Sequence, residues 1–168
     1  ASPELALSTS IRFLKEAKTH AVKLEGGARV TEQIKTLVAA GIPVMGHLGM
    51  TPQSVNALGG FKVQGRNGDG AKILADAKAI QAAGCFAIVL ELIPAELAAQ
   101  ITAELSIPTI GIGAGKDCDA QVLVWTDLMG ITVNPPRFAR VYRNFRAEMT
   151  AAVSEWASDV ESGTFPGE

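Results

Sequence analysis

The sequence predicts a parallel α/β protein of the (β/α)8 barrel type, with only the later βα units present in this chain. Apolar strand-like segments alternate with amphipathic helical segments, the pattern of repeated βα units around a parallel sheet. The predicted strands end at Glu25, His47, Glu91 and about Gly113, so their separations are 22, 44 and 22 residues. An open doubly wound sheet also fits this spacing. Polar or glycine residues at all four strand ends favour the barrel, in which strand ends converge on one mouth.

The N-terminal part of the chain is predicted as helix, strand, helix and strand. The triplet SPE at 2–4 is typical of a helix start. It supplies a hydroxyl cap, a proline at the first helical position and an acid near the positive end of the helix dipole. This helix is predicted to run to about residue 17. The elements after it are a strand at 21–25, a helix at about 28–40 and a strand at 43–48.

The C-terminal part begins with a long irregular segment at 49–70. It is rich in glycine and carries Lys62, Gln64 and Arg66, so we expect either a mobile flap over the strand ends or a plain surface loop. The whole chain, 1–168, is expected to form a single domain. The later predicted elements are a helix at 71–83, a strand ending at 91, a helix at 94–105, a strand at 108–113, a short strand or helical turn at 122–125, and a long amphipathic helix at 137–162.

Composition excludes several classes of protein. Apolar residues make up 48% of the chain and charged residues 19%, which indicates a folded protein rather than a disordered one. The net charge of −2 gives no reason to expect nucleic acid or an anionic membrane as a partner. No apolar run approaches the roughly 20 residues of a membrane span. Cys85 and Cys118 lack the companions of a zinc site or a disulfide framework, so we expect a cytoplasmic protein.

The stretch FAIVLELIP at 86–94 places one carboxylate, Glu91, at the end of an almost unbroken apolar run. Such a run is typical of a strand that is buried on both faces. A carboxylate at its end is held on a fixed backbone where the dielectric constant is low, which suits a general base. The alternatives are that Glu91 emerges into solvent or caps the helix that begins near Pro94.

Two other predicted strand ends carry charged or titratable side chains. Lys23 and Glu25 are two residues apart on a strand, so their side chains share a face. They either bind an acidic substrate and a metal or form a structural ion pair. His47 follows at the next strand end, as a pocket residue or as a hydrogen-bonded structural histidine. The glycines of GIGAG at 111–115 lack dinucleotide-binding spacing and suggest close approach of the backbone to a small ligand.

Five segments, in order along the chain, carry a resemblance to a known family. They are VKLEGG (22–27), GHLGMTPQSVNALGGFKVQGR (46–66), VLELIPAELA (89–98), IPTIGIGAG (107–115) and ESGTFPGE (161–168). On these segments the chain resembles ketopantoate hydroxymethyltransferase over essentially its whole length. The resemblance implies a (β/α)8 barrel and a homo-oligomer, in this family a decamer.

The resemblance also implies the reaction and the roles of four residues. A hydroxymethyl group passes from 5,10-methylenetetrahydrofolate to 3-methyl-2-oxobutanoate, which gives 2-dehydropantoate for pantothenate and coenzyme A synthesis, with Mg²⁺ stabilising an enolate. By the family's pattern Glu91 is the catalytic base that removes the C3 proton. Lys23 and His47 bind the substrate, and Glu25 belongs to the metal site. Because Mg²⁺ prefers oxygen ligands, Glu25 suits the ion and His47 does not.

The family's pattern also includes further βα units ahead of the first matched segment, with an Asp-Ser pair and a second Asp as principal Mg²⁺ ligands. The printed sequence has no counterpart of these ligands. Three explanations stay open. The chain is part of a longer enzyme, or a separate N-terminal piece completes the barrel, or the chain is a non-catalytic fragment or assembly module. For the 168 residues alone, we expect association and no transferase activity.

Overall fold

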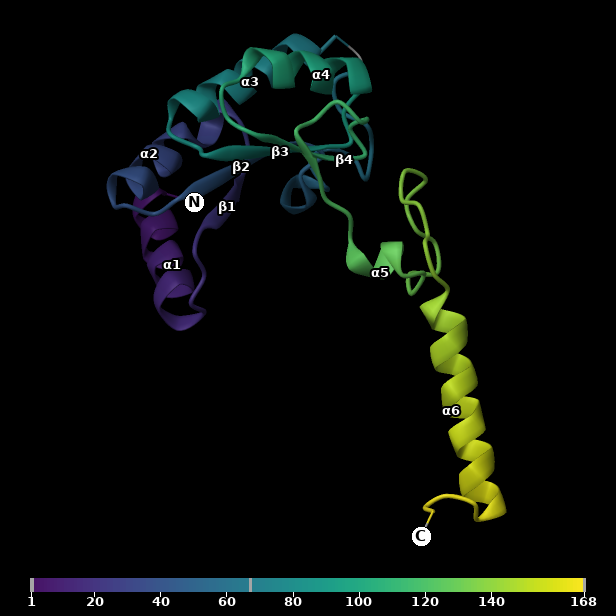
Figure 1. Ribbon diagram of the computed structural model, residues 1–168. Helices are drawn as coiled ribbons and strands as arrows, with labels where there is room; N and C mark the ends of the chain where they lie inside the picture. The colour runs from purple at the N-terminus through teal and green to yellow at the C-terminus, as the bar shows by residue number, and fades with distance from the viewer. Residues whose placement is uncertain (1, 67, 168) are drawn as a thin grey trace. The chain divides into compact units, whose positions relative to one another are not determined.

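The structure is a computed structural model that describes residues 2–66 and 68–167. The described residues divide into two compact units, one up to Val122 and one from Leu123 (Figure 1). The first unit holds all five strands, and the second holds two helices with the segment between them. The expectation of a single domain stays a prediction.

The first unit is built on a five-stranded parallel sheet in which the strands lie in chain order (Figure 1). Sequential order and a common direction are what consecutive strands in the wall of a (β/α)8 barrel have. This confirms the predicted parallel α/β class. The strands are β1 (Val22–Glu25), β2 (Val44–Gly49), β3 (Ala87–Glu91), β4 (Thr109–Ile112) and β5 (Ala120–Gln121).

The helices of the first unit fall where the sequence predicts them, to within about two residues. At the first helix, the Leu5 backbone N–H donates to Ser2 Oγ at 3.3 Å, so the predicted hydroxyl cap is present. The segment 49–70 contains only one short 3₁₀ helix in its described part. The helical elements are α1 (Pro3–Glu16), η1 (Ala28–Val30), α2 (Thr31–Ala39), η2 (Pro52–Ser54), α3 (Gly70–Ala82) and α4 (Ala95–Glu104).

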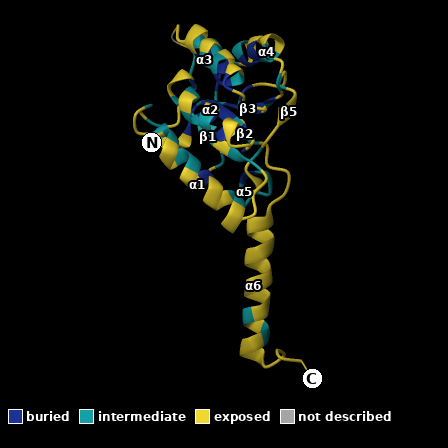
Figure 2. Ribbon diagram, turned by 90° about the vertical axis from the view of Figure 1, so that its left-hand side faces the viewer, coloured by how far each residue is buried: buried dark blue, intermediate teal, exposed yellow. Residues whose placement is uncertain are grey.

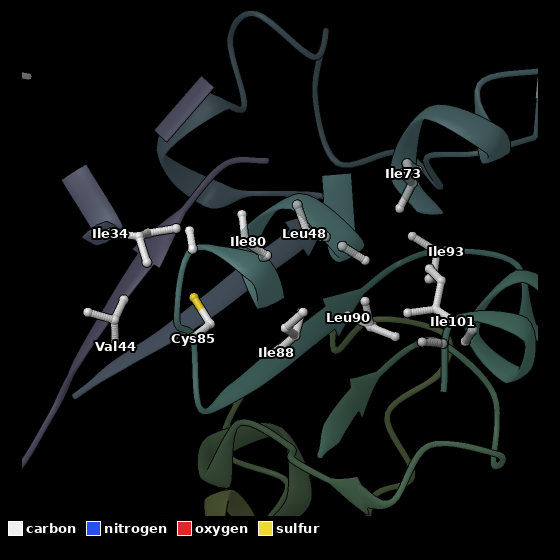
Figure 3. Packing of buried hydrophobic residues seen from close by; sticks show 14 of the residues in the cluster. Ile34, Val44, Leu48, Ile73, Ile80, Cys85, Ile88, Leu90, Ile93 and Ile101 are labelled. Carbon is white, nitrogen blue, oxygen red and sulfur yellow. The ribbon is translucent and has the colours of Figure 1, made fainter. Parts of the chain in front are cut away.

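The hydrophobic core lies between one face of the sheet and the helices that follow the strands (Figure 3). Side chains alternate between the two faces of a strand, so residues at every second position of β2 and β3 point toward this core. These include Val44, Leu48, Ile88 and Leu90, each at most 4% exposed. The first four residues of β3 are all buried, which confirms the prediction of a strand covered on both faces (Figure 2). The helices contribute Ile34, Leu37, Ile73, Ile80 and Ile101.

The second unit contains α5 (Trp125–Leu128) and α6 (Phe145–Ser162). The sequence predicts the long helix over 137–162, so its start was wrong by eight residues. Asn144 caps α6 by accepting the Ala147 N–H at 3.2 Å. The backbone before α6 is hydrogen-bonded to the end of α5. The Tyr142 N–H donates to the Leu128 carbonyl, and the Phe145 N–H donates to the Met129 carbonyl. This pairing keeps the segment before Asn144 out of the helix.

Most residues of α6 are exposed (Figure 2), and those that share one side of the helix are apolar. The segment 122–125, predicted as a short strand or a helical turn, is irregular at 122–124, with β5 ending before it and α5 beginning at Trp125. No helix in the described part of the chain has the length and apolar composition needed to cross a membrane. The exposed apolar side chains of α6 are Phe145, Met149, Val153, Trp156 and Val160.

Candidate active site

The parallel register brings three titratable side chains to one face at the carboxyl ends of neighbouring strands. Glu25 of β1 is the register partner of His47 of β2, and His47 is the partner of Val89 of β3. Glu91 follows Val89 by two residues and therefore points to the same side of the sheet. This side is opposite to the one that packs on α2 and α3. It corresponds to the interior of a barrel.

His47 lies between the two carboxylates. Its Nε2 atom is 3.0 Å from Glu91 Oε2, and its Nδ1 atom is 3.6 Å from Glu25 Oε1. The His47 side chain is 1% exposed, whereas the Glu25 and Glu91 side chains are 17% and 16% exposed. The imidazole is therefore buried, and each carboxylate keeps an edge that a small molecule can reach.

The contacts of His47 are close but not well directed. Although Nε2 is within hydrogen-bonding distance of Glu91, neither ring nitrogen has a hydrogen bond of acceptable geometry in the described structure. Polar atoms that are buried without a directed hydrogen bond are uncommon, since each costs about 1–3 kcal/mol. Whether His47 is a pocket residue or a structural histidine stays a prediction. The buried ring has donor or acceptor capacity available beside both carboxylates.

Glu25 is fixed by backbone groups on two sides. Its Oε2 atom accepts the Gln53 N–H at 3.0 Å, from the 3₁₀ helix η2. The next residue, Gly26, donates its N–H to the His47 carbonyl at 3.1 Å and extends the β1–β2 ladder beyond the carboxylate. Since η2 lies within 49–70, this segment is tied to the strand end. Whether the rest of it moves as a flap stays a prediction.

Lys23 lies on the same face as Glu25, one pleat earlier on β1, and its side chain is exposed. Among the residues that the structure describes, Glu25 pairs with His47, and Lys23 forms no ion pair. The alternative of a structural Lys23–Glu25 pair is therefore not observed. A cation without an ion-pair partner among the described residues, on the same face as Glu25, remains available to an anionic ligand.

The backbone at Glu91 is tightly held and strained. The Glu91 carbonyl accepts the Met50 N–H at 2.8 Å, and the Leu92 carbonyl accepts the Gln64 N–H at 2.8 Å. Leu92 has a φ of 47°, in the left-handed region that a bulky residue rarely adopts. Strain of this kind costs on the order of 1–3 kcal/mol and is typical of functional sites. Helix α4 has no side-chain cap, so Glu91 does not serve as one.

Two glycines of 111–115, one within β4 and one after it, lie close to other protein atoms. A Cβ added at Gly115 would lie 2.5 Å from the Ala95 Cβ, and one at Gly111 would lie 3.0 Å from Cys118 Sγ. A larger residue at Gly115 would clash with α4, and one at Gly111 would clash with the chain that follows the loop. Packing within the protein therefore explains why both positions are glycine. Approach to a ligand at this loop stays a prediction.

The fit of a metal ion to these residues is partial. Glu25 Oε1 accepts no hydrogen bond within the described structure, so it can serve as one of the oxygen ligands that Mg²⁺ prefers. Across 2–66 and 68–167, however, no group of three or more His, Cys, Asp or Glu side chains is arranged to hold a metal ion. This chain therefore offers one carboxylate to a metal. The other ligands would have to come from water, substrate or other protein groups.

The fold and the cluster define a class of protein. Acid, base and cation at the carboxyl ends of adjacent parallel strands are the arrangement of active sites in α/β enzymes of the barrel type. Comparison with known proteins gives the family. The model of the ketopantoate hydroxymethyltransferase family matches residues 1–168, so the chain belongs to this family.

Relatives with curated names are similar along almost the whole chain. A protein of Acidothermus cellulolyticus is 60% identical over 166 residues, which are 98% of this chain and 61% of the relative. One of Mycobacterium sp. (strain KMS) is 58% identical over 99% of this chain and 59% of its own length. One of Rhodococcus jostii is 54% identical over 99% of this chain and 58% of its own length. All three are named 3-methyl-2-oxobutanoate hydroxymethyltransferase. The chain thus spans about three fifths of their length.

The structure also shows groups that the sequence analysis did not single out. The Gln53 N–H holds Glu25, and Asp76 on α3 accepts the Ala28 N–H just beyond β1. A backbone donor leaves no signal in residue identity, and Asp76 lies 48 residues from Ala28. The pair of glycines after Glu25 is the one local sign in the sequence that another group packs closely against this turn.

Replacement of Gly49 by Ala should lower the free energy of unfolding more than the same replacement at Gly41. A Cβ at Gly49 would lie 2.1 Å from the Glu91 carbonyl oxygen, and Gly49 has a φ of 91°. Gly41→Ala is the matched control, because Gly41 has a φ of 78° but no atom within 4 Å of an added Cβ. In chemical denaturation we expect Gly41→Ala to cost about 1–2 kcal/mol and Gly49→Ala to exceed about 4 kcal/mol. Equal losses would contradict the close contact.

Proposed function

We propose that this protein transfers a hydroxymethyl group from 5,10-methylenetetrahydrofolate to 3-methyl-2-oxobutanoate and forms 2-dehydropantoate, a precursor in pantothenate and coenzyme A synthesis. The observation that carries this proposal is the Glu25–His47–Glu91 cluster at three adjacent strand ends. Membership of the family and the names of the similar proteins support it.

Glu91 acts as the general base that removes the proton from C3 of the oxo acid. A C–H next to a ketone is a weak acid, so the base must be positioned and partly removed from water. Glu91 meets both requirements, because its backbone is anchored at β3 and its side chain is 16% exposed. His47, 3.0 Å from Glu91 Oε2, restricts the orientation of the carboxylate and leaves the other oxygen, Oε1, for the substrate.

Mg²⁺ is the proposed metal, with Glu25 as one ligand. When bound, the ion would stabilise the negative charge that develops on the oxo acid as the proton leaves. Glu25 is suited to this role because its Oε2 atom is already held by the Gln53 N–H, which fixes the carboxylate before any ion arrives. His47 is not proposed as a ligand, since Mg²⁺ selects oxygen donors.

Lys23 and His47 bind the oxo acid. The ammonium of Lys23 lies on the same face as both carboxylates and has no ion-pair partner in the described structure, so it is free to pair with the substrate's carboxylate. His47 lines the pocket between the two carboxylates and contributes to substrate binding by orienting them toward the oxo acid. The one-carbon carrier would approach from the side that the predicted flap, 49–70, would cover.

The protein is proposed to work as a cytoplasmic homo-oligomer, a decamer by family resemblance, with no nucleic acid or membrane partner. The exposed apolar side of α6 supports association, since soluble monomers rarely expose contiguous apolar surface of this kind. A second candidate function is that of a non-catalytic fragment or assembly module that needs an N-terminal piece. The absence of a three-ligand metal group among the described residues favours it.

Glu91→Gln removes the proposed base. We expect exchange of the C3 proton of 3-methyl-2-oxobutanoate with deuterated solvent to fall by about 10²–10⁴-fold, the usual contribution of a general base. Binding of the oxo acid should change little, because the amide keeps the shape of the side chain. The assay is NMR of the oxo acid with the protein expressed from its complete gene. Glu96→Gln, an exposed site on α4, is the control. An unchanged rate of exchange in Glu91→Gln would show that Glu91 is not the general base.

Lys23→Ala removes the proposed partner of the substrate carboxylate. Loss of the ammonium should weaken binding of the oxo acid by about 10- to 100-fold, the usual worth of a hydrogen bond to a charged group. Calorimetric titration with 3-methyl-2-oxobutanoate measures this directly. Lys15→Ala on α1 is the matched control and should bind like the parent protein. If both variants bind equally well, Lys23 does not hold the substrate carboxylate.

A further inference from the structure

We infer that Asp76 is a positioning residue for Glu25, acting through the turn that follows β1. Asp76 lies on α3, far from β1 in the sequence, and reaches back to the backbone just beyond Glu25. The inference rests on the proposed role of Glu25 as a metal ligand.

The contact between Asp76 and the turn is close and specific. The Ala28 N–H donates to Asp76 Oδ1 at 2.9 Å. A Cβ added at Gly27 would lie 2.1 Å from Asp76 Cγ, so the carboxylate occupies the space that any other residue at 27 would need. Lys72 Nζ lies 2.8 Å from Asp76 Oδ2 and pairs with the second oxygen from the same helix. The Asp76 side chain is only 14% exposed, which limits competition from water.

Hydrogen bonds as well as packing hold this turn. A cavity of about 340 Å³ is lined by Gly27, Arg29, Ser54 and Asp76, together with residues of the 49–70 segment and α3. Because this hollow leaves part of the turn without packed neighbours, directed hydrogen bonds contribute to its position. Two of them span the gap, one from Ala28 to Asp76 and one from Arg29 Nη2 to Ser54 Oγ at 3.1 Å.

Both hydrogen bonds lead back to Glu25. Ser54 directly follows Gln53, whose N–H holds Glu25 Oε2 at 3.0 Å. Asp76 fixes the turn on one side of Glu25, and the Arg29–Ser54 bond ties that turn to the donor on the other side. If the Asp76 contact is lost, the turn and the carboxylate can shift together. Groups that orient a metal ligand typically affect metal affinity by about 10- to 100-fold.

The test compares three substitutions in the protein expressed from its complete gene. Asp76→Ala removes the acceptor, Asp76→Asn keeps an oxygen that can accept the Ala28 N–H, and Lys72→Met removes only the ion pair. Mn²⁺ serves as the probe, because oxygen sites that bind Mg²⁺ also bind Mn²⁺. Its affinity is measured by electron paramagnetic resonance, alongside C3 exchange and thermal unfolding.

We expect Asp76→Ala to weaken Mn²⁺ binding about tenfold, and Asp76→Asn and Lys72→Met to bind within about threefold of the parent protein. A lower melting temperature in Asp76→Ala with unchanged Mn²⁺ affinity would overturn the inference and leave Asp76 a stabilising residue only. If Asp76→Ala does not fold, Asp76→Glu decides, since its longer side chain must displace the turn, and parental Mn²⁺ affinity there overturns the inference. If the parent protein shows neither Mn²⁺ binding nor exchange, the proposed function is wrong and the inference falls with it.

Discussion

The site depends on the hydrogen-bonded register of β1, β2 and β3. Parallel pairing sets Glu25 opposite His47 and His47 opposite Val89, and the two-residue repeat of a strand then brings Glu91 to the same face. A slip of one residue in any strand would turn its side chain into the helix-covered core. The apolar residues on the other face, such as Val44 and Ile88, oppose such a slip because they would lose their burial. The packing of the core thus determines the chemistry of the opposite face.

Three features next to these strand ends are energetically unfavourable. Leu92 has a left-handed backbone, Gly49 lies against the Glu91 carbonyl, and His47 is buried without a well-directed hydrogen bond. All three adjoin Glu91, and His47 also adjoins Glu25. A fold built only for stability would remove these costs, and their concentration at one end of the sheet fits a site that binds a ligand.

The sequence predicted the elements well because strand and helix periodicities and glycine boundaries are local signals. It also predicted that Lys23, Glu25, His47 and Glu91 lie at strand ends. It could not predict that Glu25 pairs with His47 and not with Lys23, since that depends on register between strands. The start of α6 was wrong because the backbone pairing of Tyr142 with Leu128 overrides helical periodicity. The Asp76–Ala28 contact joins residues 48 positions apart and has no local signal.

The central claim is that the inner face at these strand ends binds the oxo acid with its C3 atom toward Glu91. A crystal structure of the protein from its complete gene, soaked with 3-methyl-2-oxobutanoate and Mg²⁺, tests this most directly. The account predicts C3 about 3–3.5 Å from a Glu91 carboxylate oxygen, the substrate carboxylate at Lys23 Nζ, and the ion on Glu25. An oxo acid bound elsewhere, or bound here with C3 turned away from Glu91, would contradict it.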